Sequence, residues 1–242
     1  MRMIVFAGPS LKASDRCVPS IEFHGPARCG EMARIAGADV GAIGLVDGAF
    51  ESTASPWHKE ILWLLSRNVA VFGAASLGAL RAVELARFGM VGIGRVFAAY
   101  RDQVLEDDDE VAVLHGPEGV GYIALTEALV NIRATAERAR AAKILDDAAA
   151  GAVTAAAKAL FYKDRVWSRV LQQARARGLE ARAAASLASW LPGNAVDVKR
   201  QDARALIQAM LAWRGDERAV PSFEFVNTIY WERLRRQLIP FS

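Results

Sequence analysis

The sequence predicts an α/β fold: a small, mostly parallel sheet with flanking helices, followed by an all-helical C-terminal extension. Short apolar runs that end in small or polar residues predict buried strands, and helical patterns lie between them. This alternation is typical of a parallel sheet with right-handed crossovers. Beyond residue 125 the strand signals nearly stop, and Ala, Arg, Leu and Glu dominate. We therefore expect an α/β core over residues 1–125 that carries the site, and a helical region over 126–242 packed on the core or used for partner docking.

Four strands are expected from apolar runs of strand length. The helices between them are recognised by apolar residues at helical spacing, such as His58, Ile61 and Leu65 on one face. The expected strands are residues 3–7, 42–46, 69–72 and 110–114, and the expected helical segments are 31–35, 58–65, 126–182, 201–213 and 223–238.

Three of these strands end in residues suited to a binding site. In an open parallel sheet, ligands bind beyond the carboxyl ends of the strands. That rule brings residues 8–10, 47–48 and 73–76 to one edge of the predicted sheet. We expect the functional site at this edge.

Residues 69–82 read as a strand, a tight turn of small residues and a helix, with Ser76 at the bend. Such a turn exposes a serine hydroxyl and points backbone N–H groups toward the atom that it attacks. Gly73 and the neighbouring alanines let a substrate carbonyl approach the backbone. By spacing alone, a structural turn is the commoner reason for this pattern.

Lys59 is the candidate base for Ser76. The helix that follows Asp47 starts near Pro56, a favoured first-turn residue, so its N-terminus lies at the same edge of the sheet. The helix dipole and partial burial both favour the neutral amine, which a general base requires. The result would be a Ser–Lys nucleophile–base pair. A surface lysine packed beside the neighbouring tryptophans is the alternative.

The other candidate residues bind or orient. The Leu77 N–H, helped by the loop around Ser10, is expected to hold the oxyanion. Asp47 caps its turn or orients Lys59 or a substrate. Arg81 either binds substrate or forms an ion pair with Glu84 within its helix, and His58 reads as a core histidine. The expected site has Ser76 and Lys59 as catalytic residues and Leu77, Ser10, Gly8, Asp47, Gly73 and Arg81 as oxyanion- or substrate-binding residues.

Composition excludes several classes of function. The formal net charge of +3 comes with arginines scattered through the second half, which does not predict a nucleic-acid-binding surface. No apolar run is long enough to cross a bilayer and no signal peptide precedes the first strand, so we expect a cytoplasmic protein without a membrane partner. Cys17 and Cys29 lack metal-ligand spacing, and we expect neither a metal nor a cofactor. The acidic run 106–110 reads as a solvated turn, with a metal site or recognition of a basic partner as alternatives.

Six ordered motifs in the first half of the chain resemble TfuA-like proteins. They cover roughly half of the sequence, and the second half resembles the family only in its helical character. The motifs are Gly8-Pro9-Ser10-Leu11, Val46-Asp47-Gly48-Ala49-Phe50, Trp57-His58-Lys59-Glu60-Ile61-Leu62, Gly73-Ala74-Ala75-Ser76-Leu77-Gly78-Ala79-Leu80-Arg81-Ala82, Phe88-Gly89-Met90 and Glu106-Asp107-Asp108-Asp109-Glu110-Val111.

The resemblance implies a role in peptide backbone thioamidation, one route of peptide natural-product biosynthesis. TfuA proteins act with YcaO enzymes, which use ATP to activate a peptide amide. The TfuA protein is implied to release sulfide from the C-terminal thiocarboxylate of a ThiS-like sulfur-carrier protein and to help YcaO engage its peptide. The family's hydrolase-like site uses a serine and a lysine, and Ser76 and Lys59 fit those positions best. Ser10 also lies in a family motif and is the rival nucleophile.

Three other functions remain open. The first is a docking or allosteric module without chemistry of its own. The second is a persulfide relay that uses Cys17 or Cys29. The third is an ordinary esterase, which the sequence supports poorly because His115 is the only histidine after Ser76.

Overall fold

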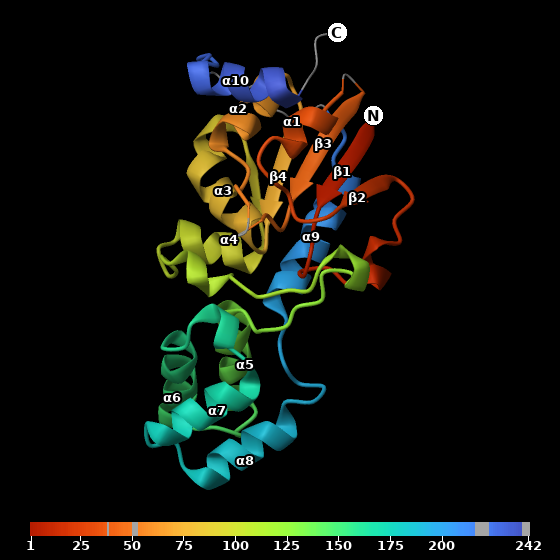
Figure 1. Ribbon diagram of the computed structural model, residues 1–242. Helices are drawn as coiled ribbons and strands as arrows, with labels where there is room; N and C mark the ends of the chain where they lie inside the picture. Colours follow the sequence, from red (N-terminus) through yellow and green to blue (C-terminus); the bar gives the residue numbers. More distant parts are fainter. Residues whose placement is uncertain (38, 50–52, 216–222, 239–242) are drawn as a thin grey trace. The chain divides into compact units, whose positions relative to one another are not determined.

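A five-stranded sheet, in which every neighbouring pair of strands is parallel, organises the first part of the chain (Figure 1). The computed structural model describes residues 1–37, 39–49, 53–215 and 223–238. The strand order is β2-β1-β3-β4-β5. The strands are β1 (Arg2–Phe6), β2 (Ile21–His24), β3 (Val40–Leu45), β4 (Ala70–Ala74) and β5 (Val91–Ile93).

Helices precede or follow each of the later strands and then continue to the end of the chain, which confirms the predicted α/β class with helices in the C-terminal region. No helix among the described residues is long and apolar enough to cross a membrane. The helices are α1 (Glu31–Ile35), α2 (His58–Ser66), α3 (Leu77–Leu85), α4 (Gly94–Arg101), α5 (Leu129–Ala141), α6 (Asp147–Lys158), α7 (Trp167–Ala176), α8 (Ala181–Trp190), α9 (Val198–Ala212) and α10 (Ile229–Leu238).

The three predicted strands at 3–7, 42–46 and 69–72 are confirmed as β1, β3 and β4, which lie at the centre of the sheet. All residues of β3 and β4 are buried, and strands buried on both faces read as continuous apolar runs. The sequence reading missed the strands at the two edges. β2 carries the exposed Glu22, and β5 is three residues long, so neither forms an apolar run.

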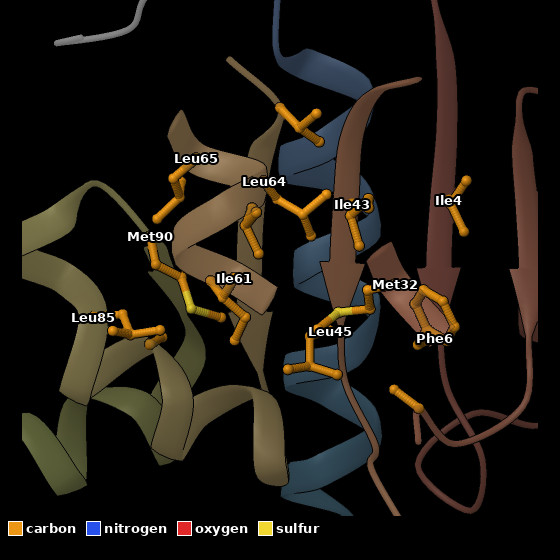
Figure 2. Packing of buried hydrophobic residues seen from close by; sticks show 14 of the residues in the cluster. Ile4, Phe6, Met32, Ile43, Leu45, Ile61, Leu64, Leu65, Leu85 and Met90 are labelled. Atoms are coloured by element: carbon orange, nitrogen blue, oxygen red, sulfur yellow. The ribbon is translucent and has the colours of Figure 1, made fainter. Parts of the chain in front are cut away.

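Each face of the sheet has its own hydrophobic core. Along β1, Ile4 and Phe6 point to one core and Val5 and Ala7 to the other, as the two-residue period of a strand requires. Figure 2 shows the first core, where strand residues meet side chains of α1, α2 and α3. Its labelled members are Ile4, Phe6, Met32, Ile43, Leu45, Ile61, Leu64, Leu65, Leu85 and Met90.

The second face is covered by α9, which comes from far along the chain. Ala203, Leu206, Ile207 and Met210 of α9 are buried against it. A parallel sheet needs cover on both faces, and the crossover helices of this chain cover mainly one. The helix approaches so closely that a Cβ atom at Gly44 would lie 2.7 Å from the side chains of Leu206 and Met210.

The chain therefore divides into two compact units, one of residues 1–106 with 200–242 and one of residues 107–199. The units divide after residues 106 and 199, whereas we expected a boundary at residue 125. Residues 107–125 group with the helices α5 to α8, and residues 200–242 of the predicted helical region belong to the unit that contains the sheet. The need to cover the second sheet face explains that arrangement.

The second unit is an array of helices around an aliphatic core that includes Leu129, Ile132, Val153 and Leu187. A buried cation ties its first residues to the helices. The Arg165 side chain is fully buried, and its Nη2 donates to Asp109 Oδ2 at 2.8 Å.

The predicted strand over 110–114 is wrong. Residues 108–110 form a 3-10 turn, and Glu110 points inward to accept two hydrogen bonds from Arg133 at 2.8 and 3.0 Å. The apolar residues after Glu110 pack into the unit without pairing as a strand of the sheet. The apolar residues of this run are therefore buried next to a 3-10 turn and do not form a strand.

Candidate active site at the carboxyl edge of the sheet

Three loops meet where β1, β3 and β4 end side by side. The N–H groups of Val46 and Asp47 donate to the Phe6 carbonyl at 2.9 and 3.3 Å, which joins the first loop to the second. The N–H of Gly78 donates to the Val46 carbonyl at 3.2 Å and joins the third. The loops that carry Ser10, Asp47 and Ser76 therefore share one edge of the sheet.

Asp47 is the centre of a buried hydrogen-bond network. Its Oδ2 accepts from the N–H groups of Gly8 at 2.8 Å and Ser10 at 3.0 Å, and its Oδ1 accepts from Ser10 Oγ at 2.7 Å. Asp47 and Ser10 are each only 3% exposed. The carboxylate therefore binds the loop after β1, as a capping residue does.

This network limits which groups of Ser10 and its loop are free to contact a substrate. The Ser10 hydroxyl is buried and donates to a carboxylate, so it is less accessible to a protein substrate than a surface serine. The N–H groups of Gly8 and Ser10 already serve Asp47. They are not available to an oxyanion in this arrangement.

Ser76 follows a strained turn. The Ser76 N–H donates to the Ala74 carbonyl at 2.7 Å across Ala75, whose φ is +66°. A three-residue turn with a positive φ at its centre is rare and strained for a residue other than glycine, and strain of this kind gathers at functional sites. Ser76 is the N-cap residue of α3, yet its side chain makes no cap hydrogen bond, and the residue is partly exposed.

Two glycines let α3 start directly against the sheet. A Cβ atom at Gly78 would lie 1.8 Å from the carbonyl oxygen of Leu45, and one at Gly73 would lie 2.1 Å from the Gly78 carbonyl oxygen. Strand and helix backbones therefore touch at both positions, which only glycine permits. Gly73 has a packing role here, and its contact fixes where Ser76 stands.

Lys59 lies in the first turn of α2, whose N-terminus neighbours α3. Its Nζ is 4.6 Å from the centre of the Phe225 ring, in a cation–π contact. Both Lys59 and Ser76 are described by the structure, and no hydrogen bond joins Lys59 Nζ to Ser76 Oγ in it. The Ser–Lys pair thus stays a prediction.

Arg81 fastens α3 to the start of α2. Its Nε donates to the Pro56 carbonyl at 3.3 Å, and its Nη1 binds Glu84 Oε2 at 2.8 Å, which is the ion pair expected within the helix. The expectation of a core histidine is wrong, because His58 is exposed and its Nε2 lies 2.7 Å from Glu84 Oε2. Burial raises the pKa of the Glu84 carboxyl, but the hydrogen bonds from His58 and Arg81 outweigh it and hold that pKa below the ordinary value.

Sequence reasoning missed Glu60, the neighbour of Lys59. Its side chain is fully buried, and its Oε1 accepts from the N–H groups of Gly30 at 2.7 Å and Trp57 at 3.1 Å. In the part of the chain that the structure describes, Oε2 has no hydrogen-bond partner. Burial raises the pKa of this carboxyl against the opposing effect of the N–H donors. Its position, third in a helix and able to cap the first turn, was the available signal.

Cys29 lies near this buried carboxyl. Burial, with a smaller contribution from the charge of Glu60, raises the pKa of the Cys29 thiol to about 11. A thiol is nucleophilic as the thiolate, so this cysteine is not activated at neutral pH. Cys17 is exposed.

Three carboxylates of the acidic run pair with cations of the second unit, whereas Glu106 and Asp108 are exposed, as expected for a solvated turn. Lys158 binds Asp107 at 2.7 Å and Asp109 at 2.5 Å, in addition to the contacts of Arg165 and Arg133 described above. Across the described residues, no group of three or more His, Cys, Asp or Glu side chains is placed to hold a metal ion.

The second unit also has a shallow cavity of about 470 Å³ between α5 and α6. Small residues make up much of its lining, which also includes Arg133, Arg140 and Lys158, each with a carboxylate partner. None of the predicted site residues lines it.

Comparison with known families identifies a family for part of the chain. Residues 47–166 match the family whose description is "TfuA-like protein". The matched segment begins at Asp47 and contains Lys59, Ser76 and Arg81, whereas Gly8 and Ser10 precede it. No curated protein matches this chain significantly.

Proposed function

The chain belongs to the TfuA-like family, and from that premise we propose that it is a hydrolase-like accessory protein of thioamide formation. The family is associated with YcaO partners in general. In the proposed reaction, the protein releases sulfide from the C-terminal thiocarboxylate of a ThiS-like sulfur carrier and supplies it to a YcaO enzyme. Ser76 is the nucleophile and Lys59 the base.

The observation that carries the proposal is the strained turn before Ser76. The positive φ of Ala75 turns the chain sharply between β4 and α3, and the Ser76 hydroxyl makes no capping hydrogen bond at the N-terminus of α3. A hydroxyl in this position meets the positive end of the helix dipole and the first N–H groups of the helix. Those groups stabilise negative charge that develops on a substrate oxygen.

The proposed steps conserve atoms and charge. Neutral Lys59 takes the Ser76 proton while Ser76 Oγ attacks the thiocarboxylate carbon and forms a tetrahedral oxyanion beside the Leu77 N–H. Lys59 then gives that proton to the departing sulfur, so collapse of the intermediate expels hydrosulfide, leaves the carrier's carboxyl group as an ester on Ser76 and restores the neutral amine. Water attacks the ester with Lys59 as base, Lys59 returns this second proton to the departing Ser76 oxygen, and the carrier's carboxyl group loses its own proton to solvent and leaves as an ordinary carboxylate. Sulfide released beside a bound YcaO enzyme meets the activated amide at high effective concentration.

Asp47 and Arg81 support these steps by position. Asp47 holds the loop after β1 through Ser10, and Arg81 fastens the start of α2, which carries Lys59, to α3, which carries Ser76 at its start. Neither contact reaches a reacting atom. We assign Arg81 to holding the N-termini of α2 and α3 together and Asp47 to holding the loop after β1.

The test is sulfide release from a purified carrier that bears a C-terminal thiocarboxylate, with no YcaO enzyme present. We expect Ser76→Ala to lower the rate at least about a thousandfold, because the nucleophile is lost. Lys59→Met should have a comparable effect, and Ser14→Ala, at an exposed serine of the same unit, should have none. Release by Ser76→Ala at the wild-type rate would exclude Ser76, and loss in Ser10→Ala alone would move the role to Ser10.

A docking module is the second candidate, and one observation favours it. Lys59 Nζ is engaged by an aromatic ring and has no hydrogen bond to Ser76. If the wild-type protein releases no sulfide above background but strengthens the binding of a peptide to YcaO, the chain is a docking module.

A further inference from the structure

The C-terminal segment 223–238 packs against the helix that carries Lys59. Figure 1 shows α10 lying beside α1 and α2, and these elements belong to one compact unit. The Trp231 ring of α10 has its centre 5.7 Å from that of Trp63 in α2, and the Phe225 ring has its centre 4.6 Å from Lys59 Nζ. The segment therefore forms part of the surface next to the candidate base.

One side of α10 faces solvent. Trp231, on the inner side, is 1% exposed. Ile229, Arg233 and Arg236 are spaced four and three residues apart, so they share the opposite side of the helix, and all are exposed. Ile229 is 74% exposed and the adjoining Tyr230 is 72% exposed. The outer side of α10 thus combines apolar and aromatic surface with basic groups.

The arginines of this helix exceed the carboxylates that could neutralise them. Arg235 lies 3.4 Å and Arg236 3.8 Å from the same Glu232 carboxylate oxygen, so two guanidinium groups share one acid. The other carboxylate of the segment is the exposed Glu224. Arg233 has no ion pair with any residue that the structure describes.

Two further arginines rest on aromatic rings of the same unit. The guanidinium carbon of Arg67 is 4.9 Å from the centre of the Trp63 ring, and that of Arg87 is 4.7 Å from the centre of the Phe88 ring. Both rings pack in turn on aromatic residues of segment 223–238. A ring orients a guanidinium group without neutralising it, and neither arginine pairs with a carboxylate among the described residues. The surface around α10 is therefore cationic.

We propose that the exposed face of α10 is the docking surface for the folded body of the sulfur carrier, through acidic side chains of the carrier that surround an apolar patch. The proposal rests on the proposed function, in which the C-terminus of the carrier reaches Ser76 and Lys59. While its C-terminus is bound there, the body of the carrier lies over surface close to Lys59, and segment 223–238 provides such surface.

The composition of the face favours a protein over the other anionic partners. Arginine and tyrosine are enriched in protein interfaces, and unpaired arginines attract acidic residues of a partner. A nucleic acid would use the arginines for its phosphates and leave Ile229 without a counterpart. A membrane-bound helix needs large apolar residues on its lipid side, whereas Trp231 is already buried within the unit.

The experiment measures binding of the purified carrier by isothermal titration calorimetry. The carrier bears an ordinary C-terminal carboxylate, so no reaction accompanies binding. In the double variant Arg233→Glu with Arg236→Gln, we expect the carrier to bind at least about tenfold more weakly than to wild type at low salt. Tyr230→Ala, which leaves the charge unchanged, should weaken binding about tenfold at every salt concentration. Wild-type binding should weaken as salt is added.

A matched control makes the same change in charge elsewhere. Arg177→Glu with Arg182→Gln alters two exposed arginines of the second unit and should leave carrier binding unchanged. Equal weakening in the two double variants, or unchanged binding in the α10 double variant, would overturn the docking surface. So would unchanged carrier binding together with loss, in the α10 double variant, of wild-type binding to DNA or to phosphatidylserine vesicles.

A sulfide-release assay with the thiocarboxylated carrier distinguishes this inference from the proposed function. If both hold, the α10 double variant has a raised KM and an unchanged kcat, because the face contacts no reacting atom. Weakened carrier binding in that variant, with no sulfide released even by wild type, overturns the hydrolase function and leaves the docking surface established. Sulfide release with an unchanged KM in the double variant overturns the docking surface alone.

Discussion

The Ser10 hydroxyl donates a 2.7 Å hydrogen bond to Asp47 Oδ1, across two loops that follow neighbouring parallel strands. The same carboxylate accepts two backbone N–H groups of the first loop. Three buried donors thus depend on one side chain. Asp47 should therefore be a residue on which the shape of the candidate site depends.

We expect Asp47→Ala to lower the free energy of unfolding by about 2–4 kcal/mol, because it leaves buried donors without an acceptor. Denaturant unfolding followed by circular dichroism measures the loss. Asp39→Ala is the matched control, since Asp39 is exposed and its ion pair with Arg2 is at the surface, where such pairs contribute about 0–1 kcal/mol. Equal losses in the two variants would contradict the network.

The start of α3 depends on the missing side chain of Gly78. We expect Gly78→Ala to cost at least about 3 kcal/mol of unfolding free energy, because its Cβ would lie 1.8 Å from a strand carbonyl oxygen. Gly151→Ala provides the contrast. It lies within α6 in open space, and alanine there should stabilise the protein by about 0.5–1 kcal/mol. A well-folded, stable Gly78→Ala protein would mean that α3 starts farther from the sheet.

Glu60 should make stability depend on pH. Its pKa is raised in the folded protein, so the folded state keeps a proton that the unfolded chain releases earlier. The contribution is fully present below the ordinary glutamate pKa and is lost as pH rises through the raised, folded-state value. Glu60→Gln should remove this part of the slope, measured as the difference in unfolding free energy between the two proteins at several pH values.

The exposed Glu118 serves as a control for Glu60, since Glu118→Gln should leave the pH slope unchanged. If Glu60→Gln and wild type differ by a constant amount across the acidic range, the Glu60 carboxyl has the same pKa in the folded and unfolded protein, which would contradict the raised pKa.

Arg165 should be indispensable to the second unit. Its buried guanidinium donates to Asp109 Oδ2 and to the backbone carbonyls of Asp109, Ala157 and Leu160. Removing one partner of a buried ion pair costs about 3–5 kcal/mol, and we expect this loss in Arg165→Met. Arg169→Met, which breaks an exposed pair with Asp164, should cost less than about 1 kcal/mol. Thermal unfolding of both variants compares them, and similar melting temperatures would refute the anchoring role.

The centre of the sheet was predictable because burial on both faces forces β3 and β4 to be apolar along their whole length. The edge strands were not, since an edge tolerates a charge such as Glu22 and a strand as short as β5. The strand expected at 110–114 failed for a related reason. Its first residue, Glu110, points inward to pair with Arg133, and only tertiary structure reveals this partner, 23 positions away.

At the candidate site, the parallel topology was enough to bring Gly8, Asp47 and Ser76 to one edge of the sheet. Topology does not specify where side chains point, so the strand order alone could not predict the hydrogen bond from Ser10 to Asp47 or the exposed position of His58. The contact between Lys59 and Phe225 joins positions 166 residues apart, and no local pattern encodes it.

The cover that α9 provides also sets an order of events during synthesis. When residues 1–106 have left the ribosome, only one face of their sheet can be covered. Val5, Ala42 and Phe72 on the other face stay uncovered until α9 is made, after the whole second unit. A nascent chain must therefore shield this apolar face while about a hundred further residues are made. We infer that chain termination before residue 210 yields an aggregation-prone product that depends on chaperones, although the strands and the loops of the candidate site have all been translated.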